Sequence, residues 1–216
     1  MEELHQRSFP VAANTYSPSG MATAKRVDGA TPNYAMQAAY PILYNYSTQI
    51  AYGDPVFLAS DGTLRIVPNG GTSILGAFRG CKYLSPTTGK VEWYSYWSAP
   101  SGLASTTVVT AYVDSDPSME FIMQGTGTAV TQSQIGLNVD IVTSSSGAPG
   151  TAPAGISTCG LLLSSISSTA TLPFRIVAIQ TAPYANTSYS SSNTNQYLRV
   201  MMNTQSNPAG TRTGQA

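Results

Sequence analysis

The stretch that decides the fold is Ile74–Tyr83, with the sequence ILGAFRGCKY, followed by the turn residues Thr88–Lys90 and by Val91–Tyr96, with the sequence VEWYSY. Both runs are rich in the β-branched and aromatic side chains that favour strands. A short connection containing glycine lies between them, which is typical of a β-hairpin. The pattern therefore predicts two paired strands in the middle of the chain.

The same pattern extends in both directions from this hairpin. Asp61-Gly62 between two apolar runs predicts a second hairpin, and Thr131–Gly136 carries the cap and stop residues of a single helical turn. No window supports a long amphipathic helix. Further strands are expected at 49–51, 55–59, 64–68, 106–113, 119–124, 139–142, 161–164, 174–180 and 196–202. Short strands at this spacing predict an all-β fold, a sandwich or barrel (jelly-roll-like) of roughly ten strands.

Three segments follow from this pattern. Residues 1–48 lack both helical and strand periodicity, and we interpret them as an extended N-terminal arm with a short helical piece around Tyr34–Ala39. A disordered tail has the same composition. Residues 49–202 form the β-rich body, and residues 203–216 form a polar C-terminal tail. The Ser-rich segments 143–160 and 185–195 are expected to be loops.

Composition limits the classes of function. The 216 residues carry no net charge, only 9% are charged, and about a quarter are Ser or Thr, whereas about 25% charged residues is usual. Scattered Lys and Arg in a neutral chain argue against nucleic-acid binding. No apolar run approaches the length that spans a bilayer, and we see no secretory signal behind Met1. A surface with so little net charge does little to prevent association, which suits a component of an assembly.

The sequence offers little for catalysis. His5 is the only histidine and lies in the predicted arm, so nucleophilic triads lack a base within the body. Asp114 and Asp116 have the spacing of two carboxylates on one side of a strand end, but Asp116-Pro117 is typical of a turn. Calcium ligation is the alternative interpretation of this pair. We expect no enzyme activity, no cofactor and no metal site.

Two cysteines do not make a disulfide framework. Cys81 lies in the apolar run Ile74–Tyr83 and is expected to be a small core residue, and Cys159 lies near a loop end. A disulfide bond between them remains open at this point.

Aromatic side chains give the candidate contact residues. In a strand, Trp93, Ser95 and Trp97 would face one way and Tyr94 and Tyr96 the other, which predicts a core face and a partner face, although burial of both faces in one sandwich is equally compatible. A second group of tyrosines lies where the arm joins the body. Tyrosine offers a large contact area with a polar tip, which suits a chain laid across a neighbouring protein. The candidate contact residues are Tyr34, Tyr40, Tyr44, Tyr46, Trp93, Tyr94, Tyr96 and Trp97.

The order and spacing of several motifs resemble a family of virion structural proteins of tailed bacteriophages, the head decoration or capsid cement proteins. The resemblance covers roughly residues 49–202 and is strongest at Gly76–Tyr83 and the aromatic residues after it. The motifs that carry it are GDPVFL at 53–58, ILGAFRGCKY at 74–83, WYSYW at 93–97, AYVDSDP at 111–117, IGLNVD at 135–140 and FRIV at 174–177.

The resemblance implies a β-rich body, often a homotrimer, on the outside of a phage capsid. Such a protein is made in the host cytoplasm and clamps neighbouring major capsid proteins, with no role for nucleic acid or membrane. We expect the arm and the tyrosines near Tyr44 to carry much of the capsid contact. The alternative is a carbohydrate- or receptor-binding module of a phage tail, which exposed aromatic side chains and Ser/Thr/Asn-rich loops would also suit.

Overall fold

The computed structural model describes residues 16–30, 37–143, 155–180 and 194–203 and confirms the predicted all-β class. Within these residues the chain forms two six-stranded sheets and one short 3-10 helix, η2 (Gln132–Gln134). The strands are β1 (Ala22–Arg26), β2 (Gln37–Ile42), β3 (Pro55–Leu58), β4 (Leu64–Ile66), β5 (Gly76–Leu84), β6 (Val91–Tyr94), β7 (Val109–Asp114), β8 (Met119–Thr126), β9 (Asn138–Val142), β10 (Gly160–Ser167), β11 (Phe174–Ile179) and β12 (Tyr197–Met202).

The first sheet closes on itself. Its order is β1-β8-β10-β9-β11-β12, and β8 also pairs with β12, so β8, β10, β9, β11 and β12 form a ring to which β1 is added. Side chains alternate between the inside and the outside of this ring: Leu198, Val200 and Met202 of β12 are buried, while the residues between them are partly exposed. The buried side chains of these strands, including Phe121 and Phe174, make one apolar core.

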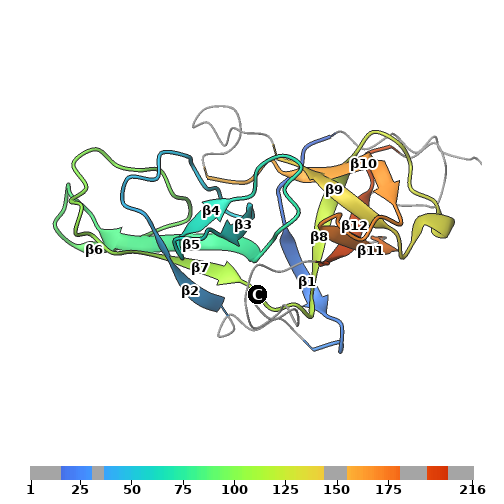
Figure 1. Cartoon of the computed structure of the whole chain (residues 1–216), viewed down its shortest axis with the longest axis horizontal. Coiled ribbons are helices and arrows are strands. Elements are labelled where there is room, and N and C mark those ends of the chain that lie inside the picture. The colour runs from blue at the N-terminus through green and yellow to red at the C-terminus, as the bar shows by residue number, and fades with distance from the viewer. Residues whose placement is uncertain (1–15, 31–36, 144–154, 181–193, 204–216) are drawn as a thin grey trace, which may run out of the picture.

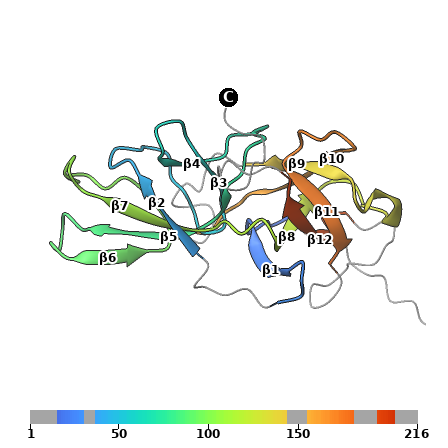
Figure 2. The ribbon, with the colours of Figure 1, turned by 60° about the horizontal axis from the view of Figure 1, so that its bottom comes forward.

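The second sheet has the order β2-β7-β5-β3-β4, with β6 paired to β5. Its inner side packs on a separate core that contains Phe78, Cys81, Trp97 and Val113. The two sheets lie side by side along the long axis of the molecule, and two views show the same arrangement (Figures 1 and 2). Among the described residues, no helix has the length and apolar character that spanning a membrane requires.

Backbone hydrogen bonds join the two halves of the molecule. The amide of Met21, the residue before β1, donates at 2.8 Å to the carbonyl of Gly53, which lies two residues before β3. Tyr52 donates to Gly155 at 2.7 Å and accepts from Ser157 at 2.9 Å. Three segments far apart in the sequence therefore meet between the sheets.

The boundary expected at residue 48 does not match the structure. The described part of segment 1–48 contributes β1, which pairs with β8, and β2, which pairs with β7 along its whole length. The helical piece expected around Tyr34–Ala39 is wrong for residues 37–39, which belong to β2. Pairing with neighbouring strands satisfies the backbone of these segments although their sequences show no strand pattern. Residues 204–216 of the expected tail lie outside the described residues.

The three predicted local motifs are confirmed. In the central hairpin, β5 pairs with β6 antiparallel. Asp61-Gly62 joins β3 to β4, and the Asp61 carboxylate accepts from the amide and the hydroxyl of Thr63 at 3.0 and 2.7 Å. The single helical turn is η2, where the Gln134 side chain accepts from the amide of Thr131 at 2.9 Å.

Candidate functional site

One side of the second sheet is left uncovered by the described chain. Directly paired residues of neighbouring strands point to the same side of a sheet, and the pairs Leu84–Val91, Lys82–Trp93 and Lys82–Thr110 place these side chains together. The pairs Pro41–Thr110 and Ala39–Tyr112 extend the surface onto β2. We call this surface the outer face; its residues are Ala39, Pro41, Lys82, Leu84, Val91, Trp93, Val108, Thr110 and Tyr112.

The outer face exposes large apolar side chains. Exposed fractions are 74% for Val108, 67% for Val91, 53% for Trp93 and 49% for Leu84. Single exposed apolar residues are ordinary on protein surfaces, but a contiguous group on adjacent strands marks an interaction site. Lys82 is the one charged residue at the outer-face positions, and none of these positions holds a carboxylate.

A glycine shapes the centre of the outer face. Gly80 has a φ of +133° at a bulge in β5, and the indole ring of Trp93 lies against its backbone, where a Cβ atom would collide with the ring. The ring of Trp93 thereby reaches the ring of Tyr112 on β7, at a centroid distance of 5.1 Å. The ammonium group of Lys82 lies 5.5 Å from the centroid of the Tyr112 ring, within the range of a cation–π contact.

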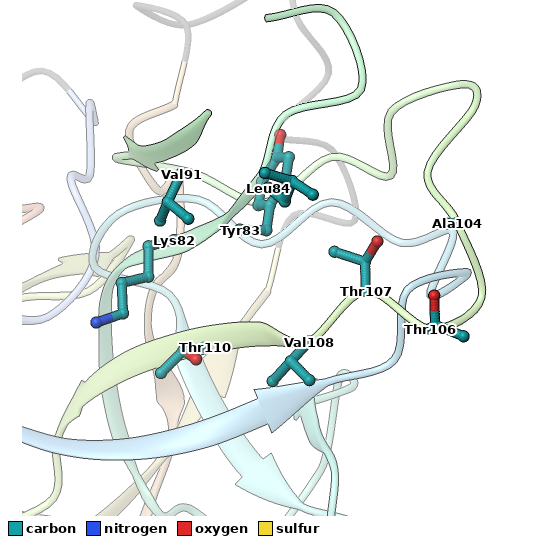
Figure 3. Close-up of a pocket in the computed structure, with 9 residues that line it drawn as sticks. All are labelled: Lys82, Tyr83, Leu84, Val91, Ala104, Thr106, Thr107, Val108 and Thr110. Carbon is teal, nitrogen blue, oxygen red and sulfur yellow. The ribbon is translucent and has the colours of Figure 1, made fainter. Parts of the chain in front are cut away.

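Beside these rings the outer face is hollowed. A hollow of about 390 Å³ lies between the ends of β5 and β6 and the segment that leads into β7 (Figure 3). Its apolar lining comes mainly from Leu84, Val91 and Val108. The remaining side chains that line it are Lys82, Tyr83, Ala104, Thr106, Thr107 and Thr110.

The expected alternation of the aromatic segment is wrong at its end. Trp93 is exposed, whereas Trp97 is fully buried and donates from Nε1 to the carbonyl of Tyr46 at 2.9 Å. The reason is that β6 ends at Tyr94, so the chain leaves strand geometry before Trp97. Trp97 instead packs edge-on against Tyr83, on the same inner side where Tyr94 stacks on Tyr83 at 4.6 Å. Trp97 is therefore a core residue and not a surface contact.

The tyrosines expected at the join of arm and body do not gather on the outer face. Tyr40 and Tyr46 pack against the second core, and the Tyr46 hydroxyl accepts from the amide of Ile66 at 3.3 Å. Tyr44 is half-buried in the segment after β2, Tyr96 is half-buried after β6, and Tyr34 lies outside the described residues. Eight aromatic residues were candidates for partner contact from the sequence. Among those that the structure describes, only Trp93 belongs to the outer face.

The carboxylates at the end of β7 have structural roles. Asp116 accepts from the amide of Ser118 at 2.8 Å, which confirms the turn. Asp114 forms a buried ion pair with Arg79 at 2.5 Å, and the same guanidinium also donates to Thr23 of β1 at 3.4 Å. Among the residues described, no three or more His, Cys, Asp or Glu side chains form a group that suits a metal ion.

A second buried carboxylate lies where the two halves meet. Asp54 is 6% exposed and accepts from the amide of Ala51 at 2.7 Å. Burial raises the pKa of Asp54 to about 6, while hydrogen bonds from Ser157 and Ala51 partly oppose this shift. This carboxyl group therefore titrates near pH 6 in the folded protein.

Both cysteines are buried free thiols, so the open question of a disulfide bond is settled. Cys81 packs in the second core, as predicted, and Cys159 packs in the first. Burial raises the pKa of the Cys81 thiol to about 12. The pKa of the Cys159 thiol is raised well above its usual value by burial and by the negative charge of the nearby Asp54. Neither thiol is a reactive thiolate at neutral pH.

Sequence reasoning found only Trp93 of the outer face and missed the rest, which are Ala39, Pro41, Lys82, Leu84, Val91, Val108, Thr110 and Tyr112. A usable signal was present at the hairpin: the turn at Thr88–Lys90 places Leu84 opposite Val91, on the side away from the buried Cys81 and Tyr83. Whether Leu84 and Val91 stay uncovered depends on the rest of the fold. The local sequence pattern carries no information about that.

Taken together, this surface can bind a partner through apolar contact and one positive charge. Searches against protein-family models, curated proteins and solved structures gave no match.

Proposed function

We propose that this chain is a structural protein of a tailed-bacteriophage virion, a head decoration or cement protein that docks on the outside of the capsid through the outer face. The observation that carries the proposal is the contiguous exposure of Leu84, Val91, Trp93 and Val108 on one sheet. The resemblance of residues 49–202 to this family supplies the class of partner, the major capsid protein.

The physical mechanism is repeated burial of apolar surface. Fully burying one large apolar side chain contributes about 1.5–3 kcal/mol, so four residues such as Trp93 and its neighbours make one modest interface. In a homotrimer on a symmetric shell, symmetry repeats the same contact many times. Neighbouring capsid subunits are then held together without any strong single contact.

The ordered connection between the two sheets supports a clamping role. Arg79 of β5 reaches both Asp114 of β7 and Thr23 of β1, so one buried guanidinium ties the second sheet to the first. A connection of this kind suits a protein that transmits force between neighbours.

The proposal is tested on phage heads prepared with and without the protein. Decorated heads should survive heating or osmotic shock that breaks bare heads, and a density map should place the outer face against the capsid. Equal survival of both kinds of head, or a map that places the protein elsewhere in the particle, would contradict the proposal.

Carbohydrate binding at a phage tail is the second candidate. A hollow of about 290 Å³ on the inner side of the hairpin favours it, because Tyr94 and Tyr96 line it together with the hydroxyl groups of Ser85 and Ser98. Tyrosine rings next to hydroxyl groups suit a neutral sugar. A glycan array distinguishes the two candidates, since a cement protein should bind no glycan on it.

A further inference from the structure

The hollow on the outer face lies at a fork between two strands. β5 and β7 pair as far as Lys82–Thr110. β5 continues to Leu84, and in this last part it pairs only with β6. Before Thr110, the segment that leads into β7 diverges from β5. Val108 and Thr107 of this segment line the far wall of the opening (Figure 3). The space therefore opens where the two strands diverge.

The size and lining of the fork suit a few side chains of an extended segment. A volume of about 390 Å³ is at the small end of ligand pockets. Leu84, Val91 and Val108 offer apolar walls, while the threonines on the lining offer hydroxyl groups to a polar backbone. An aliphatic or aromatic side chain fits such walls better than a charged one.

Lys82 at the closed end of the fork gives the charge of the occupant. Its ammonium group rests near the Tyr112 ring, and no ion pair with Lys82 is present among the described residues. The nearby Glu92 is turned to other partners, because it accepts from Thr88 at 2.6 Å and from Tyr94 at 2.5 Å. Lys82 is thus available for a carboxylate from outside.

The outer face of a second copy of the chain is a poor occupant. Two outer faces brought together would bury two Lys82 ammonium groups, and no outer-face position of either copy holds a carboxylate to pair with them. Burying unpaired charge is strongly unfavourable. Charge complementarity therefore argues against pairing of two outer faces and favours a partner surface that carries a carboxylate.

We propose that the fork binds an extended acidic-apolar segment of the partner protein, with an aliphatic or aromatic side chain between Leu84 and Val108 and an Asp or Glu carboxylate on Lys82. The identity of that partner as a capsid protein rests on the proposed function, but the chemistry of the segment does not.

The test is selection of a random heptapeptide library on the immobilised full chain. Enriched peptides should combine an apolar residue with Asp or Glu one or two positions away. A synthetic peptide from this set should bind Lys82→Gln about tenfold more weakly than the wild type and should not bind Val108→Glu. Val108 is 74% exposed, so this substitution leaves the cores untouched.

Lys90→Gln is the matched control, because Lys90 is an exposed lysine of the same hairpin that does not line the fork. It should bind the peptide as the wild type does. Absence of enrichment, enriched peptides without an acidic residue, or equal binding by Lys82→Gln would overturn the proposal. If the peptides behave as expected but the protein does not decorate heads, the capsid assignment fails and the fork assignment stands.

Discussion

The rings of Trp93 on β6 and Tyr112 on β7 lie 5.1 Å apart although their strands do not pair with each other. They meet across β5 because Gly80 has no side chain to separate them. A bulge in the central strand thus brings two aromatic side chains together on the outer face, where they meet solvent and not a core. A bulge that re-aims side chains in this way is common next to functional sites.

Gly80→Ala should destabilise the protein by more than backbone strain alone. A new Cβ atom would collide with the Trp93 ring and lie 2.7 Å from the carbonyl oxygen of Tyr94, at a φ of +133°. The control is Gly62→Ala, which has a φ of +77° and no atom within 4 Å of the new Cβ. Strain at such a φ costs about 1–3 kcal/mol. Denaturant unfolding should show the larger loss for Gly80→Ala, and equal losses would contradict the described packing of Trp93.

Asp54 should make the protein more stable as the pH falls from about 7 to about 4. Its pKa is raised from 3.8 to about 6 in the folded chain, so the folded state binds the proton more tightly than the unfolded state does. Stability is therefore lost as the pH rises through this window, by about 3 kcal/mol at most, at 1.36 kcal/mol per pKa unit. Asp54→Asn should remove this dependence, as measured by the difference in unfolding free energy between wild type and variant.

Asp61 provides a control of opposite sign. Hydrogen bonds from Thr63 lower its pKa below 3.8, so its contribution is present above that pH and is lost as the pH falls through the lower folded value. The difference between wild type and Asp61→Asn should therefore shrink at low pH. The difference in unfolding free energy between wild type and Asp54→Asn should change with pH in the opposite direction to that of Asp61→Asn. A change in the same direction would mean that Asp54 is not buried as described.

Breaking the ion pair between Arg79 and Asp114 should cost about 3–5 kcal/mol, because one buried charge is then left without its partner. Both side chains are at most 10% exposed. The ion pair between Arg65 and Asp61, whose side chains are 39% and 41% exposed, provides the comparison, and its loss should cost much less because solvent screens exposed charges. Thermal unfolding of Asp114→Asn and Arg65→Ala measures both, and similar losses would place Arg79 near solvent.

The two thiols should react with an aromatic disulfide reagent only when the protein unfolds. Burial of Cys81 and Cys159 raises both pKa values, so the native protein lacks an accessible thiolate at pH 8. The reaction rate should follow unfolding as denaturant is added. Rapid modification of native protein would contradict the burial of the thiols.

Most body strands were predictable because each carries local information, but the strand expected at 49–51 is only an isolated bridge between Ile50 and Trp97. The apolar runs of β5, β8, β11 and β12 are found within a few residues of their expected bounds, and Asp61-Gly62 gave the hairpin between β3 and β4. These elements combine strand-forming side chains with turn chemistry. A local pattern of that kind can be recognised in the sequence without knowledge of the rest of the fold.

β1 and β2 could not be predicted in this way. Ala22–Arg26 and Gln37–Ile42 contain few strand-forming residues, and they become strands because β8 and β7 offer them free edges. The outer face was missed for the same reason. Exposure of Val108 and Leu84 is a property of what the remaining chain leaves uncovered.

The most direct test of the central claim is the occupancy of bare phage heads by wild-type protein, Val108→Glu and Val27→Glu, measured by quantitative binding at equal protein concentration. Val27 is the matched control, because it is a 54% exposed valine next to β1, away from the outer face. Val108→Glu should reduce occupancy at least about tenfold, since a buried unpaired carboxylate is costly, while Val27→Glu should bind as the wild type does. Equal binding by all three proteins would show that the outer face is not the docking surface.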